Sequence, residues 1–319
     1  MKIAVFASHS GSDMQAIVDG CKNGKIAGKV CAVISNNSDA FVLKRAKKEN
    51  ISSYFVNAKL YPEENGVDNK ILEILGFHKI DMIFLAGYLK LLGKPILQKY
   101  RNMIFNIHPA LLPKFGGKGM YGMNVHKAVI EAKEKDSGIT IHRVNEEYDT
   151  GEIIAQTQVP VFENDTPKNL AERIFKEEHI FLVDVINDII EIKQISDSIA
   201  PCGLVCKLCQ FADSCGGCKS ETNCCGSRKS DEGCYQYNCC EKKRFDGCWQ
   251  CEIAPCNKGM FSESHDVRLR AFITYIKRNG KDKLADRLYH NAQNGVHYGH
   301  GKDYDNLDSI NAVIERIEG

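Results

Sequence analysis

Cysteine is distributed so unevenly along this 319-residue chain that it divides the sequence into two parts. Two of the 15 cysteines lie in the first 200 residues, whereas the other 13 fall between Cys202 and Cys256. A segment this rich in thiols and this poor in large apolar side chains cannot bury a core like that of a longer domain. We therefore expect one domain over 1–193, a linker over 194–200 and a second domain over 201–319.

The first domain alternates runs typical of β-strands with runs typical of α-helices. Strands are expected at 2–8, 30–35, 52–56, 81–86, 103–107, 138–144 and 152–161. Helices are expected at 14–21, 39–50, 67–75, 94–100, 125–135 and 168–192. This alternation predicts an α/β fold with a doubly wound, mostly parallel sheet, which binds its ligands at the carboxyl ends of the strands.

Charge and hydropathy restrict the classes of partner. The 42 basic residues nearly match the 41 acidic ones, so the charge balance predicts no nucleic-acid partner. No apolar run is long enough for a membrane-spanning helix, and the N-terminus enters a strand without the regions of a signal peptide. We expect a cytoplasmic protein that acts on small molecules away from membranes. Disulfide bonds are disfavoured in that reducing compartment.

The end of the strand at 103–107 carries residues suited to carbonyl chemistry. Asn106 and His108 are two positions apart, so both side chains project to the same side of an extended chain. Pro109 and Pro113 end regular structure and place the pair beside a loop. An amide N–H can stabilise an oxyanion, and an imidazole exchanges protons near neutral pH. The alternative for an isolated Asn-x-His is a turn residue followed by a loop histidine.

The run Asn106-Ile107-His108-Pro109, followed by Leu111-Leu112-Pro113, resembles the signature of the folate-dependent formyltransferases. The resemblance extends over residues 1 to about 190. It implies that a formyl group is transferred from 10-formyltetrahydrofolate to the amine of glycinamide ribonucleotide, a step of purine biosynthesis. It also implies three catalytic residues, which are Asn106, His108 and Asp149.

The resemblance gives each catalytic residue a role. Asn106 and protonated His108 would stabilise the negative charge that develops on the formyl oxygen when the amine attacks. Asp149 would raise the pKa of His108 and hold a water that relays the proton of the amine. No covalent enzyme intermediate is needed. Without the resemblance, Asp149 would be interpreted as a turn residue before Gly151.

Binding residues also follow from the resemblance. Those implied for the phosphate-bearing acceptor are Gly11, Ser12, Asp13 and Glu178. Those implied for the folate are Leu89, Lys90, Leu91, Leu92, Asn106, Asn145, Glu146, Glu147 and Tyr148. The family usually has asparagine where this chain has Asp13, and a carboxylate beside a phosphate is unfavourable unless backbone amides hold the anion.

Asp13 therefore keeps other acceptors open. The same catalytic residues could formylate another amine, as in amino-sugar formyltransferases, or transfer the formyl group to water, as in formyltetrahydrofolate hydrolases. A rival from a different class is a metal-sensing or redox-sensing module whose N-terminal domain only binds folate. The complete set of Asn106, His108 and Asp149 argues against that rival.

The cysteines of the second domain predict metal binding. Three Cys-x-x-Cys pairs occur at 206–209, 215–218 and 248–251, and a single turn can place both sulfurs of such a pair on one ion. The candidate ligands are Cys202, Cys206, Cys209, Cys215, Cys218, Cys224, Cys225, Cys234, Cys239, Cys240, Cys248, Cys251 and Cys256. These 13 thiols could supply up to three four-cysteine zinc sites, and iron–sulfur clusters compete for the same ligands.

The opening of this domain, Cys202-Gly203-Leu204-Val205-Cys206-Lys207-Leu208-Cys209, resembles a cysteine-rich family of unassigned function that is found alone or fused to other proteins. Metal is expected to be required for its folding. Helices are expected at 266–277, 281–293 and 307–317. Histidines 290, 297 and 300 are interpreted as surface residues rather than ligands. A structural, a partner-binding and a sensing role all remain open for this domain.

Overall fold

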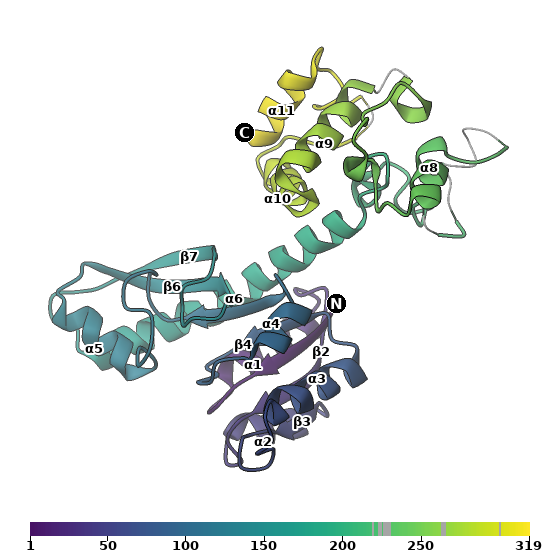
Figure 1. Ribbon diagram of the computed structural model, residues 1–319. Helices are drawn as coiled ribbons and strands as arrows, with labels where there is room; N and C mark the ends of the chain where they lie inside the picture. Colours follow the sequence, from purple (N-terminus) through teal and green to yellow (C-terminus); the bar gives the residue numbers. More distant parts are fainter. Residues whose placement is uncertain (219, 223–224, 226–230, 263–265, 300) are drawn as a thin grey trace. The chain divides into compact units, whose positions relative to one another are not determined.

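The computed structural model describes residues 1–218, 220–222, 225, 231–262, 266–299 and 301–319. The chain divides into two compact units, Met1–Ile190 and Glu191–Gly319 (Figure 1). Within the described ranges, no helix is both long enough and apolar enough to cross a membrane.

A seven-stranded sheet forms the centre of the first unit, with the strand order β3-β2-β1-β4-β5-β6-β7. The strands are β1 (Lys2–Phe6), β2 (Lys29–Ser35), β3 (Ser52–Phe55), β4 (Met82–Leu85), β5 (Ile104–His108), β6 (Asp136–Arg143) and β7 (Ile153–Pro160). Strands β1 to β5 pair in parallel, whereas β6 and β7 are antiparallel. The predicted α/β class and mostly parallel sheet are confirmed.

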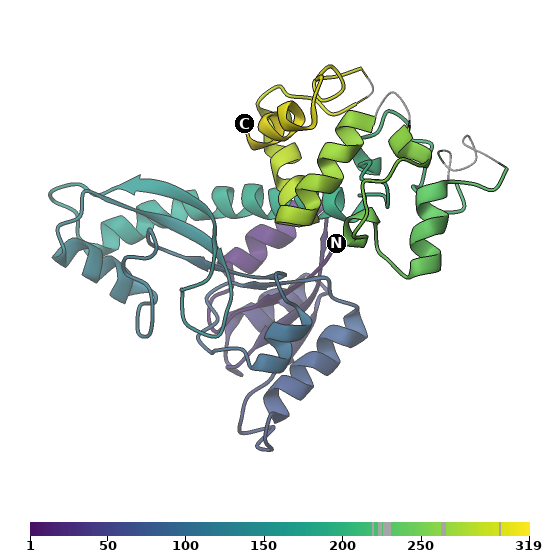
Figure 2. The ribbon, with the colours of Figure 1, turned by 45° about the horizontal axis from the view of Figure 1, so that its top comes forward.

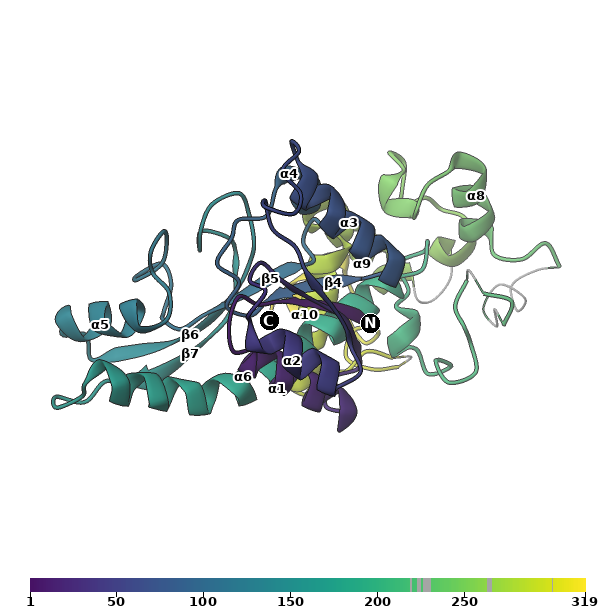
Figure 3. The same cartoon turned by 90° about the horizontal axis from the view of Figure 1, so that it is seen from below.

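Helices cover both faces of this sheet. Those of the first unit are α1 (Ser12–Lys22), α2 (Phe41–Lys48), α3 (Gly66–His78), α4 (Lys94–Lys99), α5 (Met123–Glu131) and α6 (Pro167–Asp197). Figure 3 shows α1, α2 and α6 on one side of the sheet and α3 and α4 on the other. Each face of the sheet has an apolar core, and strand β1 contributes side chains to both. Ile3 and Val5 pack on the α1 side, while Ala4 and Phe6 pack on the α3 side.

Several helix boundaries differ from the predicted ones, including those of α3, which spans Gly66–His78 instead of 67–75, and of α5, which spans Met123–Glu131 instead of 125–135. Helix α2 begins at Phe41 rather than residue 39, because the Asn37 side chain accepts the Asp39 N–H at 3.1 Å and forms a turn there. Helix α6 continues to Asp197, through the first part of the segment that the sequence marks as a linker. At its other end, Thr166 accepts the Asn169 N–H at 3.2 Å and caps the helix.

The second unit combines the cysteine-rich segment with three packed helices, which are drawn in green to yellow in Figure 2. These helices are α9 (Asp266–Asn279), α10 (Lys281–Gln293) and α11 (Ile310–Glu318), close to the predicted positions. Their apolar faces share one core. The cysteine-rich segment adds η1 (Cys206–Leu208), α8 (Tyr235–Lys243), η2 (Cys248–Gln250) and η3 (Gly259–Ser262). Helix α8 is polar and lacks an apolar stripe, so no hydrophobic pattern predicted it.

Candidate active site

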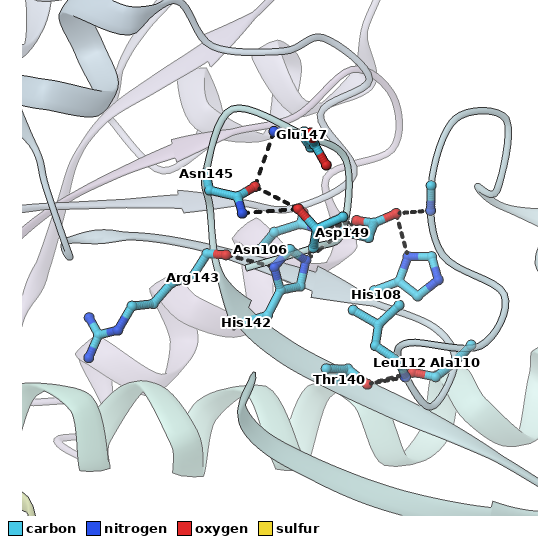
Figure 4. A network of polar contacts seen from close by, with 12 residues as sticks. Asn106, His108, Ala110, Leu112, Thr140, His142, Arg143, Asn145, Glu147 and Asp149 are labelled. Carbon is cyan, nitrogen blue, oxygen red and sulfur yellow. Dashed lines mark hydrogen bonds and ion pairs between the residues drawn. The ribbon is translucent and has the colours of Figure 1, made fainter. Parts of the chain in front are cut away.

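Strand β5 positions the predicted pair at the carboxyl edge of the sheet. Asn106 and His108 are its third and last residues, and His108 is buried. Antiparallel pairing with β6 places Asn106 opposite His142. The loop after β6 brings Asp149 to the same place, so Asn106, His108 and Asp149 meet although they lie far apart in the sequence (Figure 4).

His142 fixes the orientation of the Asn106 amide. The Nδ1–H of His142 donates to the Arg143 carbonyl at 2.8 Å, and its Nε2 lies 3.0 Å from Asn106 Nδ2. The same Nδ2 donates to Asp149 Oδ1 over a longer 3.4 Å. No sequence motif had indicated a role for His142. The available signal was its place two residues after Thr140 in a predicted strand beside the one that carries Asn106.

His108 is held between a carbonyl and a carboxylate. Its Nε2–H donates to the Phe115 carbonyl at 2.8 Å, and its Nδ1 lies 3.6 Å from Asp149 Oδ2. Burial lowers the pKa of His108, and this effect exceeds the opposing influence of Asp149 and of the Phe115 carbonyl. The expected influence of Asp149 is present, because its charge raises the pKa of His108, but the net shift is downward. Asp149 is close, as expected, but removing the ring from water outweighs its charge.

Asp149 is an ionised acceptor at the centre of the cluster. Burial raises its pKa, but contact with His142, the Gly117 N–H at 2.9 Å and the charge of His108 together leave the pKa of Asp149 below its ordinary value. The residue has a left-handed backbone conformation, with φ of 57°. The bond from Gly117 ties the glycine-rich loop after β5 to this carboxylate.

A cavity of about 700 Å³ opens beside these side chains. The predicted residues that line it are Gly11, Ser12, Asp13, Leu89, Lys90, Leu91, Leu92, Asn106, His108, Glu147, Tyr148, Asp149 and Glu178. The other two predicted residues lie outside this lining. Asn145 instead bonds Thr150 Oγ1 at 3.0 Å and the Glu147 N–H at 3.1 Å, and Glu146 pairs with Lys94 at 3.5 Å. These three contacts involve the loop that carries Tyr148 and Asp149.

His126 is a further lining residue that sequence analysis missed. It lies on α5, is 6% exposed, and its buried Nδ1 has no hydrogen-bond partner within the described part of the chain. Burial, and secondarily His108, lowers the pKa of His126, so the ring is neutral at physiological pH. A neutral, unpaired imidazole facing a cavity can bind a polar group of a ligand.

The first turn of α1 forms the opposite end of the cavity. Gly11 precedes the helix with φ of +70°, and a Cβ there would lie 2.4 Å from Val42 Cγ2, so glycine is required. Asp13 lies 3.4 Å from His179 of α6. Burial, followed by the charge of Asp13, raises the pKa of Glu178 to about 8. Glu178 is thus largely protonated at neutral pH.

The predicted metal ligands form closely spaced pairs rather than a complete site. Among the described residues, no group of three or more His, Cys, Asp or Glu side chains is arranged to hold a metal ion. Cys240 and Cys248 have their sulfurs 3.8 Å apart, beside a cavity of about 90 Å³ that Cys239, Cys251 and Cys256 also line. Cys224 and His300 lie outside the described residues. His290 pairs with Asp286 at 3.4 Å and is exposed.

Sheet order, the three side chains around Asp149 and the cavity together define a protein of the formyl-transfer type. The family model described as formyl transferase matches residues 1–186, more than half of the chain. The chain therefore belongs to the formyl transferase family. This result does not extend to the cysteine-rich second unit, which the family model leaves uncovered.

Similar proteins point to one particular member of the family. Phosphoribosylglycinamide formyltransferase of Escherichia coli is 34% identical over 59% of this chain and 86% of its own length. The chloroplastic enzyme of that name from Arabidopsis thaliana is 44% identical over 60% of this chain, which spans 65% of that relative. The solved structure of glycinamide ribonucleotide transformylase 1 from Symbiobacterium toebii is 38% identical, with a TM-score of 0.55 over 59% of this chain and 87% of that one.

Proposed function

We propose that the first unit is a phosphoribosylglycinamide formyltransferase, which transfers the formyl group of 10-formyltetrahydrofolate to the amine of glycinamide ribonucleotide. The observation that carries this proposal is the meeting of Asn106, His108 and Asp149 at the wall of a 700 Å³ cavity. That cavity runs from the first turn of α1 to the 89–92 loop, so it provides both an anion-binding end and an end lined by leucines.

The geometry supports a direct transfer. The acceptor amine forms a bond to the formyl carbon, and negative charge develops on the formyl oxygen. One N–H of Asn106 is bound tightly to His142, while the other spans 3.4 Å to Asp149. The longer hydrogen bond, to Asp149, is the weaker of the two. The N–H group that makes it can therefore donate to the oxyanion instead. His142 thereby acts as a positioning residue for Asn106.

Proton transfer falls to His108 and Asp149. Neutral His108 already uses its Nε2–H on the Phe115 carbonyl, so Nδ1 is the atom that accepts the proton released by the attacking amine, directly or through a water. The resulting imidazolium lies 3.6 Å from the Asp149 carboxylate, which stabilises it. Breaking the bond from the formyl carbon to N10 of the folate completes transfer, and the proton returns to N10.

A steady-state assay with 10-formyltetrahydrofolate, with and without glycinamide ribonucleotide, tests the assignment. We expect tetrahydrofolate release that depends on the ribonucleotide. Release without it would mean that water is the acceptor and would identify a hydrolase. Release that requires an amino sugar instead would leave the catalytic residues unchanged and overturn only the acceptor.

The role of His108 has its own test. His108→Ala should reduce kcat at least 1,000-fold, on the order of what a general base together with its charge stabilisation contributes, while folate binding measured by fluorescence changes little. A matched substitution, His78→Ala, removes a histidine at the end of α3 that bonds Tyr54 at 2.7 Å and lies outside the cavity lining. It should leave kcat unchanged. Turnover by His108→Ala near the wild-type rate would refute the mechanism.

For the second unit, we infer zinc binding by cysteine thiolates. Four sulfurs at about 2.3 Å from a tetrahedral zinc ion are about 3.8 Å apart, and the Cys240 and Cys248 sulfurs are separated by 3.8 Å. A disulfide would require about 2.05 Å. Cys239, Cys251 and Cys256 line the same small cavity and can complete the ligand set, with Lys243 donating to Cys251 at 3.5 Å.

Metal analysis of the purified chain tests this inference. We expect zinc in stoichiometric amount, and a lower content in Cys240→Ser/Cys248→Ser. Cys21→Ser/Cys31→Ser in the first unit is the matched control and should keep the full content. Iron together with acid-labile sulfide would indicate an iron–sulfur cluster instead of zinc. A metal-free chain with the same circular dichroism would refute metal binding.

A further inference from the structure

The acceptor end of the cavity contains an acid where an anion is expected to bind. Helix α1 has no side-chain cap, so the N–H groups of its first turn are available to a ligand. Asp13 lies within that turn and lines the cavity. An ionised carboxylate there repels a phosphate through a site that water only partly screens.

His179 is the one basic side chain seen to form an ion pair with Asp13 in the described chain. The Asp13 Oδ1 and His179 Nε2 atoms are 3.4 Å apart. Both atoms are buried, and neither has a hydrogen-bond partner among the described residues. Phe175 packs its ring against the His179 imidazole, with centroids 4.6 Å apart, and limits where the imidazole can move. The contact is therefore a close approach of two buried polar atoms rather than a hydrogen bond, and the neighbouring Phe175 ring helps to hold it in place.

The remaining charged groups nearby do not replace this contact. Glu178 adjoins His179 on α6 and contributes a second acid, although burial and Asp13 raise its pKa to about 8. Arg45 of α2 donates its Nε to the Ser10 carbonyl at 3.0 Å and places its guanidinium over Phe41. Those contacts direct Arg45 to the loop backbone and to the Phe41 ring, whereas His179 faces the Asp13 carboxylate itself.

We propose that His179 is a specificity-determining residue: its imidazole lies against the Asp13 carboxylate and, in its protonated form, neutralises that carboxylate, so that a phosphate-bearing acceptor can bind at the first turn of α1. The inference rests on the proposed function, because it concerns the phosphate end of the same acceptor. His179 touches neither the formyl group nor the folate. Its effect acts on acceptor binding and leaves the chemical step unchanged.

A double-mutant cycle of Asp13→Asn and His179→Gln tests the pair. In His179→Gln, the uncompensated Asp13 should raise the KM for glycinamide ribonucleotide about tenfold, or about 1.4 kcal/mol, with kcat within twofold. In the Asp13→Asn background no carboxylate remains to be neutralised, so His179→Gln should change KM less than threefold. Asp13→Asn alone should lower KM, since His179 then attracts the phosphate unopposed.

Two controls separate charge from structure. His290→Gln removes a second His–Asp pair of the same 3.4 Å length on the surface of the other unit. It should leave the KM for glycinamide ribonucleotide and the KM for 10-formyltetrahydrofolate unchanged. Inhibition by inorganic phosphate gives a readout independent of turnover, and its Ki should rise in His179→Gln in the same proportion as KM. The KM for 10-formyltetrahydrofolate should stay constant in all four members of the cycle.

The outcomes distinguish this inference from the proposed function. A wild-type enzyme that does not formylate glycinamide ribonucleotide overturns the proposed function, and the inference with it. An active wild type in which His179→Gln raises KM equally in both backgrounds overturns the inference alone, because the loss is then independent of Asp13. A fall in kcat at unchanged KM would also overturn it.

Discussion

At the scale of single residues, Glu178 shows how burial can keep an acid protonated. The folded chain raises its pKa from 4.5 to about 8, through burial first and the charge of Asp13 second. The unfolded chain therefore ionises Glu178 at a pH where the folded chain still holds the proton. Stability must fall as the pH rises through this interval, because the folded state binds more protons there.

Glu178→Gln should remove this pH dependence. The difference in Tm between Glu178→Gln and the wild type should increase from pH 5 to pH 8 and become constant above it, with the variant more stable. Glu177→Gln, at an exposed neighbouring position of α6, is the control and should show a small, constant difference. A constant difference for Glu178→Gln as well would mean that Glu178 is ionised in the folded protein.

His108, the proposed catalytic histidine, marks the limit of prediction from single residues. The sequence identified His108 and placed Asp149 near it through a family resemblance, and both side chains meet. It could not give the direction of the pKa shift of His108, because that depends on how deeply the ring is buried. The roles of His142 and His126 could not be predicted either, because they arise from strand pairing and packing rather than from a motif.

At the scale of elements, the antiparallel pair β6–β7 depends on close approach of the chains. A Cβ at Gly138 would lie 2.1 Å from the Thr157 carbonyl oxygen and 2.5 Å from Leu111. Thr140, two residues further on β6, donates its hydroxyl to the Ala110 carbonyl at 2.6 Å and accepts the Leu112 N–H at 3.1 Å. Strand β6 thereby supports the loop that follows His108.

Gly138→Ala should therefore destabilise the first unit by about 1–3 kcal/mol, the range for overpacked sites, and should also lower kcat through the displaced loop. Gly76→Ala is the matched control, because it adds the same methyl group to α3 with no atom within 4 Å. It should stabilise the protein by up to about 1 kcal/mol through helix propensity. Urea unfolding measures both, and equal effects would show that the tight contact at Gly138 relaxes freely.

The elements that could be predicted were those with a clear pattern of apolar residues along the sequence. Strands β1, β2, β4 and β5 are buried along most of their length, so their apolar runs stand out, and they lie within two residues of the expected bounds. The cysteine-rich segment has no comparable period. Its α8 and three short 3₁₀ turns carry no apolar stripe from which a sequence pattern could predict them.

At the scale of the whole molecule, the two units differ in what holds them together. The first buries two large apolar cores, one on each face of the sheet. The second has a core of helices and a separate small cluster in which thiols such as Cys202, Cys240 and Cys248 are themselves buried. Burial without a ligand raises the pKa of the Cys248 thiol, whereas a bound metal would hold it as a thiolate.

This difference predicts two separable responses to metal removal. A strong chelator should abolish the cooperative unfolding transition of the second unit, because the folding free energy of a thiolate site is largely its metal-binding free energy. The first unit should keep its transition and its formyl transfer, since its cores contain none of the 13 clustered cysteines. Calorimetry and the transfer assay on the same chelated sample measure both, with zinc added back as the control.

Loss of transfer on chelation, restored by zinc, would show that the second unit controls catalysis and would contradict the independence of the two units. Unchanged calorimetry would instead refute the proposed metal site.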